Sequence, residues 1–214
     1  AVVDGAPLPR GWVGKVWAMQ QGARAAGDAR WLLFTDADIL HAPGGLRGLV
    51  AAAESAGLVL DSRMALLRCA SGPERLLVPP FLLFFLLLYP LRWANRARGR
   101  VAAAAGGCML VRRDALEAAG GPEAFRDALI DDLAMARRLR GQGAVRLAVS
   151  TGAVRSLRAY EGVAPIWHMV RRSAFTQLRR SWPLLAGVLL VLLLMFLVPP
   201  VALVAGVAAG AAGA

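Results

Sequence analysis

The stretch Trp31-Leu32-Leu33-Phe34-Thr35-Asp36-Ala37-Asp38 decides the expected fold, because an apolar run ends abruptly in two carboxylates. A run of this length is typical of a strand covered on both faces, and such strands belong to parallel sheets flanked by helices. In open α/β sheets the ligand site lies at the carboxyl ends of the strands. Asp36 and Asp38 at that edge can share a divalent cation with substrate phosphates and water. The alternative is that both residues only mark a turn and cap a helix that begins near Gly44.

Helical and strand-like stretches alternate along the rest of the chain. Helices are expected at 12–26, 46–55, 131–140 and 163–182, and strands at 58–67, 101–112 and 145–149. Acidic residues at the start of the 131–140 stretch match the helix dipole, so Asp131 and Asp132 are either helix-start residues or site residues. Gly106 and Gly107 interrupt a strand and permit a bulge or a close approach to a ligand. The alternation predicts a three-layer α/β core.

The composition narrows the classes of partner. The chain of 214 residues has a net charge of +11 and contains no recognisable nucleic-acid motif, so anionic lipid headgroups and a phosphorylated substrate explain the excess of cations better than nucleic acid does. Cys69 and Cys108 are too few for a disulfide framework, and we expect both to be reduced core thiols. His41 has no partner at metal-ligand spacing and is expected in a loop.

The C-terminal end is strongly apolar. No charged residue occurs from 181 to 214, and residues 183–214 are predicted to form a transmembrane region. A membrane span needs about 20 apolar residues, so this region can hold one kinked span or the start of a hairpin around Pro199 and Pro200. Arginines at 171, 172, 179 and 180 precede it and indicate that the preceding domain faces the cytoplasm.

A second apolar segment lies inside the chain. The run from 81 to 89 is too short to cross a bilayer, is rich in aromatic residues, and precedes arginines at 92, 96, 98 and 100. This pattern favours an interfacial segment within 76–98, whose cations would meet lipid phosphates. The alternative is an ordinary buried helix.

Five short motifs follow one another in order: PRGWVGK at 9–15 leading to QQG at 20–22, TDAD at 35–38, GGCMLVRR at 106–113, IDD at 130–132, and QLRRSW at 177–182. Together they resemble the processive and lipid-directed family-2 glycosyltransferases of the GT-A fold, most closely the hopanoid-associated glycosyltransferases of bacterial membranes. The resemblance covers nearly the whole chain. It implies an α/β, GT-A type three-layer nucleotide-diphospho-sugar transferase core at 1–160, an amphipathic basic interfacial helix at 161–182, and the transmembrane region. Because no convincing strand precedes Trp31, we expect the core to be N-terminally incomplete.

The resemblance also implies roles for individual residues. Asp38 with Asp36 would bind Mg²⁺ or Mn²⁺ on the donor diphosphate, and Asp132 would be the catalytic base of an ED-type motif in which Asp131 replaces Glu. Lys15 would lie near the donor nucleotide. Residues facing the acceptor and the donor sugar would be Gly106, Gly107, Cys108 and Asp131.

The last motif resembles the QxxRW signature that closes over the donor diphosphate. The corresponding residues here are Gln177, Arg179, Arg180 and Trp182, but Ser181 separates Arg180 from Trp182. Which arginine pairs with the diphosphate is therefore open, and the alternative is that these residues only form the basic flank of the membrane segment.

The expected function is thus an inverting glycosyltransferase at the inner (cytoplasmic) membrane. It would transfer a sugar from a nucleotide-sugar, expected to be a UDP-sugar, to a membrane lipid acceptor such as a hopanoid, with no nucleic-acid partner. Two alternatives stay open: a processive polysaccharide synthase, and a non-catalytic membrane scaffold with the same fold.

Overall fold

The computed structural model describes residues 2–96, 99, 101–178 and 180–212, and it divides into two compact units, Ala1–His168 and Met169–Ala214. The helices of the first unit are α1 Gly14–Ala25, α2 Gly45–Ser55, α3 Gly72–Leu88, α4 Leu91–Ala94, α5 Arg113–Ala118, the 3₁₀ helix η1 Pro122–Phe125, and α6 Asp131–Leu139. Its strands are β1 Trp31–Thr35, β2 Ile39–His41, β3 Leu58–Met64, β4 Cys108–Arg112, β5 Ala144–Val149 and β6 Val154–Ser156. Helix α7 Val163–Gln177 crosses into the second unit, which continues with α8 Trp182–Phe196 and α9 Val198–Ala212.

The main sheet has the strand order β1-β4-β3-β5. β4 is antiparallel to both β1 and β3, whereas β3 and β5 are parallel. The mixed α/β fold predicted from the sequence is confirmed, but the expected parallel neighbour of β1 is wrong. Both faces of β1 do contact apolar side chains, since Leu32 belongs to one core cluster and Leu33 packs against another. A continuous apolar run therefore indicates that both faces of the strand are covered, but it does not indicate whether the neighbouring strand is parallel or antiparallel.

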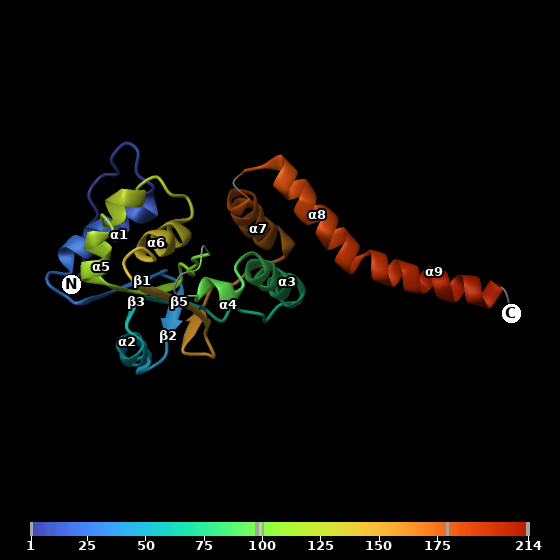
Figure 1. Cartoon of the computed structure of the whole chain (residues 1–214), viewed down its shortest axis with the longest axis horizontal. Coiled ribbons are helices and arrows are strands. Elements are labelled where there is room, and N and C mark those ends of the chain that lie inside the picture. The colour runs from blue at the N-terminus through green and yellow to red at the C-terminus, as the bar shows by residue number, and fades with distance from the viewer. Residues whose placement is uncertain (1, 97–98, 100, 179, 213–214) are drawn as a thin grey trace. The chain divides into compact units, whose positions relative to one another are not determined.

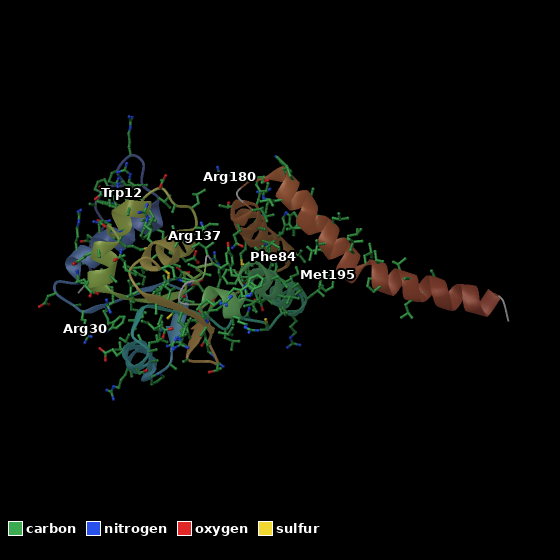
Figure 2. All side chains as sticks on the ribbon, in the orientation of Figure 1. Trp12, Arg30, Phe84, Arg137, Arg180 and Met195 are labelled. Carbon is green, nitrogen blue, oxygen red and sulfur yellow. The ribbon has the colours of Figure 1, made fainter. Side chains whose placement is uncertain are left out.

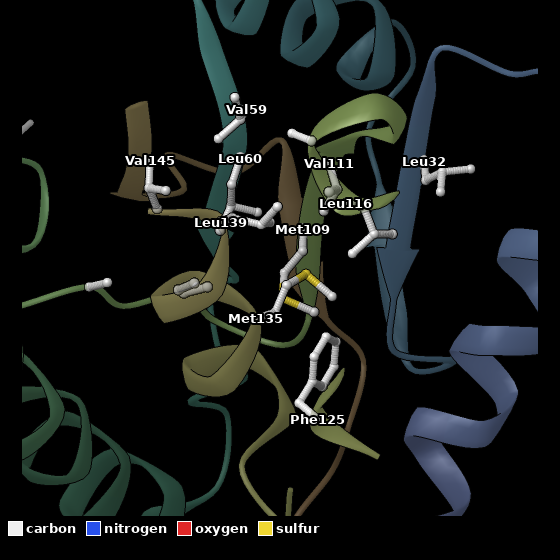
Figure 3. Packing of buried hydrophobic residues seen from close by; sticks show 14 of the residues in the cluster. Leu32, Val59, Leu60, Met109, Val111, Leu116, Phe125, Met135, Leu139 and Val145 are labelled. Carbon is white, nitrogen blue, oxygen red and sulfur yellow. The ribbon is translucent and has the colours of Figure 1, made fainter. Parts of the chain in front are cut away.

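Alternating side chains of β4 divide the core into two layers. Met109 and Val111 pack with residues of α1, α5 and α6, whereas Cys108 and Leu110 pack with residues of α2. Figure 1 shows α1, α5 and α6 on one side of the sheet and α2 on the other. Figure 3 shows Met109 of β4 close to Met135 of α6 within the first layer. The sheet is thus covered by helices on both faces, as the period-two alternation of a strand requires.

A small second sheet was missed from the sequence. Strand β2 pairs antiparallel with β6, and His41 lies opposite Val154. Three-residue strands carry too little periodicity to be detected. The strand expected at 101–112 is also shorter than predicted, because only Cys108–Arg112 joins the sheet. Residues 105–108 instead form a turn closed by a hydrogen bond from the Cys108 amide to the Ala105 carbonyl at 3.2 Å.

Helix α3 runs through the prolines that were expected to bound an apolar segment. Pro79 and Pro80 lie inside its 17 residues. Its start is fixed by a capping box in which Ser71 Oγ accepts from the Glu74 amide and the Glu74 carboxylate accepts from the Ser71 amide. Only Glu74 and Val78 of this helix are buried, so α3 is not a core helix.

The second unit consists largely of apolar helix. The segment Trp182–Gly206 is long and apolar enough to cross a membrane by length and composition, and its most apolar window has no buried part. Figure 1 shows α9 continuing beyond α8 and not folding back on it, and Figure 2 shows side chains such as Met195 projecting from α8. Pro199 and Pro200 fall in the first turn of α9, where their missing amide hydrogens cost no helical hydrogen bond.

Candidate active site

Charged side chains from three separate elements meet at one end of the sheet. Lys15 is the second residue of α1, Asp36 follows β1 directly, and Asp131 begins α6. The Lys15 ammonium lies 2.9 Å from Asp36 Oδ1 and 3.2 Å from Asp131 Oδ2. Asp131 is 8% exposed, and Lys15 is its only ion-pair partner within the described part of the chain. Three segments far apart in the sequence are therefore joined through one cation.

The two carboxylates after β1 lie in a tight turn. The Ile39 amide donates to the Asp36 carbonyl at 3.2 Å, which closes the turn, and the Leu157 amide donates to the Asp38 carbonyl at 2.8 Å. The Asp38 carboxylate lies 3.8 Å from Arg158. Neither aspartate caps α2, whose N-cap is Gly44 and receives no side-chain hydrogen bond. Asp36 and Asp38 do mark a turn, but the helix-capping alternative is wrong.

The donor set at this turn is compatible with a hard divalent cation that shares its ligands with a substrate. Carboxylate oxygens suit Mg²⁺, which keeps several waters and commonly takes one or two protein carboxylates with substrate phosphates. Among the residues described, no three His, Cys, Asp or Glu side chains form a complete metal cage. Among the described residues, Lys15 is the cation that pairs with both Asp36 and Asp131, and Asp132 is a third carboxylate close to it, so these four side chains carry excess negative charge. The carboxylates of Asp36 and Asp38 are thus of the type that a hard divalent cation accepts, with its remaining ligands coming from outside the protein.

Asp132 differs from its neighbours in how its carboxylate is held. Its Oδ2 accepts a hydrogen bond from the Gly106 amide at 2.9 Å, and its Oδ1 accepts from the Leu133 amide at 2.7 Å. Burial, followed by the negative charge of Asp131, raises the pKa of Asp132 to about 6, against the smaller opposing effects of these amides and of Lys15. A carboxylate with such a pKa can accept a proton near neutral pH.

The pKa of Lys15 moves the other way from what burial alone would cause. Burial is the largest single influence and lowers this pKa, but the charges of Asp131 and Asp36, together with that of Asp132, outweigh it and raise the pKa. Lys15 therefore stays protonated and positively charged at neutral pH. In this structure its ammonium is engaged by carboxylates and does not project freely as a phosphate-binding group.

The turn at 105–108 is held by side chains on either side of it. Ser62 Oγ of β3 accepts from the Ala105 amide at 2.8 Å, and Thr35 Oγ1 of β1 donates to the Gly107 carbonyl at 2.9 Å. A Cβ added at Gly106 would lie 2.9 Å from Lys15 Nζ and 3.3 Å from Asp132 Oδ2. Only a glycine lets the backbone approach the charged cluster this closely.

Sequence reasoning missed Ser62 and Thr35 as residues that position the turn. Ser62 is fully buried within the apolar stretch of β3, and Thr35 immediately precedes Asp36. A polar residue inside an apolar strand is a usable signal, because a buried hydroxyl must find hydrogen-bond partners. The identity of those partners required the antiparallel pairing of β4.

Comparison with known proteins places the chain in a family. The model of glycosyl transferase family 21 matches residues 6–213. The chain belongs to glycosyl transferase family 21. Among curated proteins none matches. Among solved structures, the chain is similar to glucosyl-3-phosphoglycerate synthase from Mycobacterium tuberculosis, crystallised with phosphoglyceric acid, with 21% identity and a TM-score of 0.44. The similarity covers 82% of this chain and 56% of that protein, so the chain spans little more than half of its length.

The family 21 assignment confirms the glycosyltransferase class expected from the five motifs. The match identifies neither a family-2 mechanism nor a hopanoid acceptor. The mechanism and the acceptor are therefore taken up as proposals below.

Of the two cysteines in the family 21 chain, Cys108 is a free core thiol, as expected, and Cys69 is free but exposed. Cys108 is fully buried among Leu110, Ala65 and other core residues, so its side chain points into the core. Burial, followed by the charge of Asp61, raises the pKa of the Cys108 thiol to about 11. Cys69 is free, as expected, but it is exposed and is not a core residue. Cys108 is the first residue of β4, and the alternation of side chains along this strand places it, with Leu110, in the core layer that includes α2.

The last motif of the family 21 chain lies in the second unit. Gln177 ends α7, Trp182 begins α8 with its ring centroid 5.0 Å from that of Phe175, and Arg179 lies outside the described residues. Arg180 adopts a positive φ of 54° at the corner between the two helices. Ser181 is the N-cap of α8, accepting from the Leu184 amide at 3.4 Å. The inserted serine thus has a local structural role.

Proposed function

We propose that this family 21 chain transfers a sugar from a nucleotide-sugar, a UDP-sugar in the simplest case, to the hydroxyl of a membrane lipid. Its core would be of the GT-A type, and a hopanoid is one lipid that meets the requirement. The observation that carries the proposal is Asp132, a carboxylate held by the Gly106 amide with a pKa raised to about 6, next to the cluster of Asp131, Lys15 and Asp36.

The chemistry assigned to Asp132 is that of a general base. The acceptor oxygen would form a bond to the anomeric carbon while the bond from that carbon to the donor phosphate oxygen breaks. The electron pair of the broken bond leaves with the nucleoside diphosphate, and the acceptor proton passes to Asp132. A single direct displacement of this kind inverts the anomeric configuration.

Asp131 and Lys15 would support that step without taking the proton. Asp131 is ion-paired with Lys15, and its negative charge helps to keep the pKa of Asp132 high. Two adjacent carboxylates in different environments can divide their roles in this way.

The turn after β1 is the proposed place for Mg²⁺ or Mn²⁺. Asp38 and Asp36 would hold the ion, which when bound supplies charge neutralisation for the departing diphosphate. Lys15 Nζ lies 2.9 Å from Asp36 Oδ1, and in this proposal its positive charge would act on the diphosphate from beside the ion. Gly106 and Gly107 would face the donor sugar through their backbone, because Lys15 and Asp132 lie where a Gly106 side chain would be and Ile39 lies where a Gly107 side chain would be.

The exposed face of α3 supports a lipid acceptor. Leu76, Leu83 and Leu87 are 71%, 47% and 52% exposed and recur at helical spacing, so they form one apolar stripe. Arg75 at one end, and Arg92 and Arg96 beyond the other, are exposed cations. An apolar stripe with flanking arginines suits the boundary of an anionic bilayer, where apolar side chains enter the acyl region and cations meet phosphates. We therefore keep 76–98 as an interfacial segment.

The apolar segment Trp182–Gly206 supports attachment to a membrane by length and composition. We propose the arrangement expected from the sequence, with a transferase domain at 1–160, an interfacial helix at 161–182, a transmembrane region at 183–214, and the domain facing the cytoplasm. Gln177, Arg180 and Trp182 would then lie at the bilayer surface, with Arg179 and Arg180 as candidates for pairing with the donor diphosphate.

The first test is release of nucleoside diphosphate by the protein in native-like membranes, with a panel of UDP- and GDP-sugars, extracted lipids, and Mn²⁺ or EDTA. The proposal expects release with one donor class that requires the metal and is lost in Asp38→Asn. A matched control is Asp28→Asn, an exposed aspartate in the loop before β1. No release with any donor would favour the non-catalytic scaffold, and a lengthening saccharide product would favour the polysaccharide synthase.

A further inference from the structure

His41 takes part in a hydrogen-bonded chain that ends at the turn holding the candidate base. Its Nε2 lies 3.0 Å from Thr35 Oγ1, and Thr35 Oγ1 lies 2.9 Å from the Gly107 carbonyl oxygen. Sequence reasoning expected His41 in a loop, but it lies in β2, with its backbone paired opposite Val154. The ring is therefore presented to the end of β1 by a second sheet.

The direction of the hydrogen bonds follows from counting protons. A carbonyl oxygen can only accept, and the single hydroxyl proton of Thr35 has two carbonyls within reach, Gly107 at 2.9 Å and Asp36 at 3.4 Å, of which Gly107 is the nearer. Thr35 Oγ1 can then only accept from His41, which assigns the imidazole proton to Nε2. His41 Nδ1 is buried and has no hydrogen-bond partner within the described residues, which agrees with a ring that uses only Nε2 as a donor.

The Gly107 carbonyl belongs to the same short turn as the amide that holds Asp132. Cys108 closes this turn onto Ala105, and the Gly106 amide within it donates to Asp132 Oδ2 at 2.9 Å. Restraining the carbonyl of Gly107 restrains the orientation of the preceding peptide units. Ser62 restrains the other end of the turn, through Ala105.

We propose that His41 is a positioning residue for Asp132, acting through Thr35 and the turn at 105–108. The inference rests on the proposed function, in which Asp132 is the base. His41 touches neither donor nor acceptor in this account. It holds the Gly106 amide in the direction that the Asp132 carboxylate requires.

The kinetic test compares variants that differ only in hydrogen-bonding ability. His41→Phe and Thr35→Val remove the donor groups and keep the bulk, and each should lower kcat about tenfold, equivalent to one hydrogen bond lost, with little change in the donor KM. The groups that face Asp132 are Lys15, Asp131 and the amides of Gly106 and Leu133. Loss of the Gly106 contact removes one group that lowers the Asp132 pKa, so the acidic limb of the rate profile should move to higher pH.

Rescue and control variants separate positioning from general damage. His41→Gln keeps an N–H donor and should recover much of kcat, and His41→Phe combined with Thr35→Val should be no worse than either change alone. Asp28→Asn alters an exposed residue in the loop before β1 and should behave as wild type. An active wild type whose His41→Phe variant keeps both kcat and pH profile would overturn the inference while leaving the proposed function intact.

Amide hydrogen exchange tests the same inference without any need for sugar transfer. Amide hydrogen exchange at Gly106 should become faster in His41→Phe and in Thr35→Val, but not in Asp28→Asn. Unchanged exchange at Gly106 in the first two variants would also overturn the inference.

Discussion

Asp132 is the residue on which the chemical account depends, and its pKa gives a pH prediction. Burial and the charge of Asp131 raise this pKa to about 6. A general base must be ionised, so the transfer rate should rise with pH through about 6 and level off above it. Below the midpoint the rate should fall about tenfold per pH unit, as expected for one titrating group. Initial rates between pH 4.5 and 8 check this, and a flat profile would contradict it.

Gly106 gives a second prediction at the scale of single residues. A Cβ at this position would lie 2.9 Å from Lys15 Nζ and 3.3 Å from Asp132 Oδ2. Gly106→Ala should therefore displace the charged cluster and lower kcat roughly 100-fold, because misplacement of a catalytic group by about 1 Å costs about that much. Gly48→Ala in α2 is the matched control, since a Cβ there meets no atom within 4 Å. Equal activity of the two variants would show that Gly106 does not shape the site.

At the residue scale, the sequence indicated which residues form the charged cluster but not which side chains pair with one another. Lys15, Asp36, Asp131, Asp132 and Gly106 were all selected, and the structure brings them together. That Lys15 pairs with Asp36 and Asp131 depends on how α1 and α6 lie at the end of β1, and the position of Cys108 depends on the antiparallel pairing of β4 with β1. Pairings between distant strands leave no local periodicity, so motif spacing could not supply them.

Among the elements, the start of α3 depends on one buried carboxylate. Glu74 accepts hydrogen bonds from the amides of Ser71, Tyr160 and Ala70, and it is ion-paired with Arg68 at 2.8 Å. The Ser71 and Tyr160 amides, opposed in part by burial, lower the pKa of Glu74 to about 2. This carboxylate therefore ties the loop before α7 to the N-terminus of α3.

Glu74→Gln should lower the thermal midpoint of unfolding, because an amide cannot replace all of these accepting oxygens. A carboxyl with a lowered pKa stabilises the fold above its ordinary value of 4.5, and this contribution disappears as the pH falls toward about 2. The difference in Tm between wild type and variant should thus be largest near neutral pH and should shrink between pH 4.5 and 2. Circular dichroism melts across this range check it, and a pH-independent difference would contradict it.

Long elements were predictable from the sequence and short ones were not. The helix expected at 131–140 is α6, and the strand expected at 145–149 is β5, each within a residue of the prediction. Both carry clear signals, such as acidic residues at the start and basic residues at the end of α6. The prolines at 79 and 80 were misleading, because the capping box and the apolar face of α3 outweigh the two hydrogen bonds that they remove.

Across the whole molecule, apolar surface is exposed in both units. The stripe on α3 belongs to the first unit, and the segment Trp182–Gly206 belongs to the second. Large exposed apolar surfaces are uncommon on soluble proteins and mark contacts with partners or membranes. The sequence located both surfaces because hydropathy needs no knowledge of the fold.

The α3 stripe yields a prediction about acceptor use. Leu83→Glu together with Leu87→Glu should reduce transfer to a lipid presented in anionic vesicles about tenfold, because a carboxylate repels the anionic surface and cannot enter the acyl region. Leu46→Glu on α2 is a matched control, since Leu46 is 48% and Leu83 is 47% exposed. Transfer to a detergent-dispersed acceptor should be unaffected in all variants. Equal losses for α2 and α3 variants would contradict a lipid-facing role for α3.

The most direct test of the whole account is transfer of a labelled sugar from the nucleotide-sugar to extracted membrane lipid, measured for wild type and for Asp132→Asn. Donor binding to both proteins is measured in parallel. The account predicts that Asp132→Asn binds the donor with unchanged Kd and transfers at least 100-fold more slowly, within the range of about 10²–10⁴ typical of a lost general base. Transfer by Asp132→Asn at the wild-type rate would contradict it.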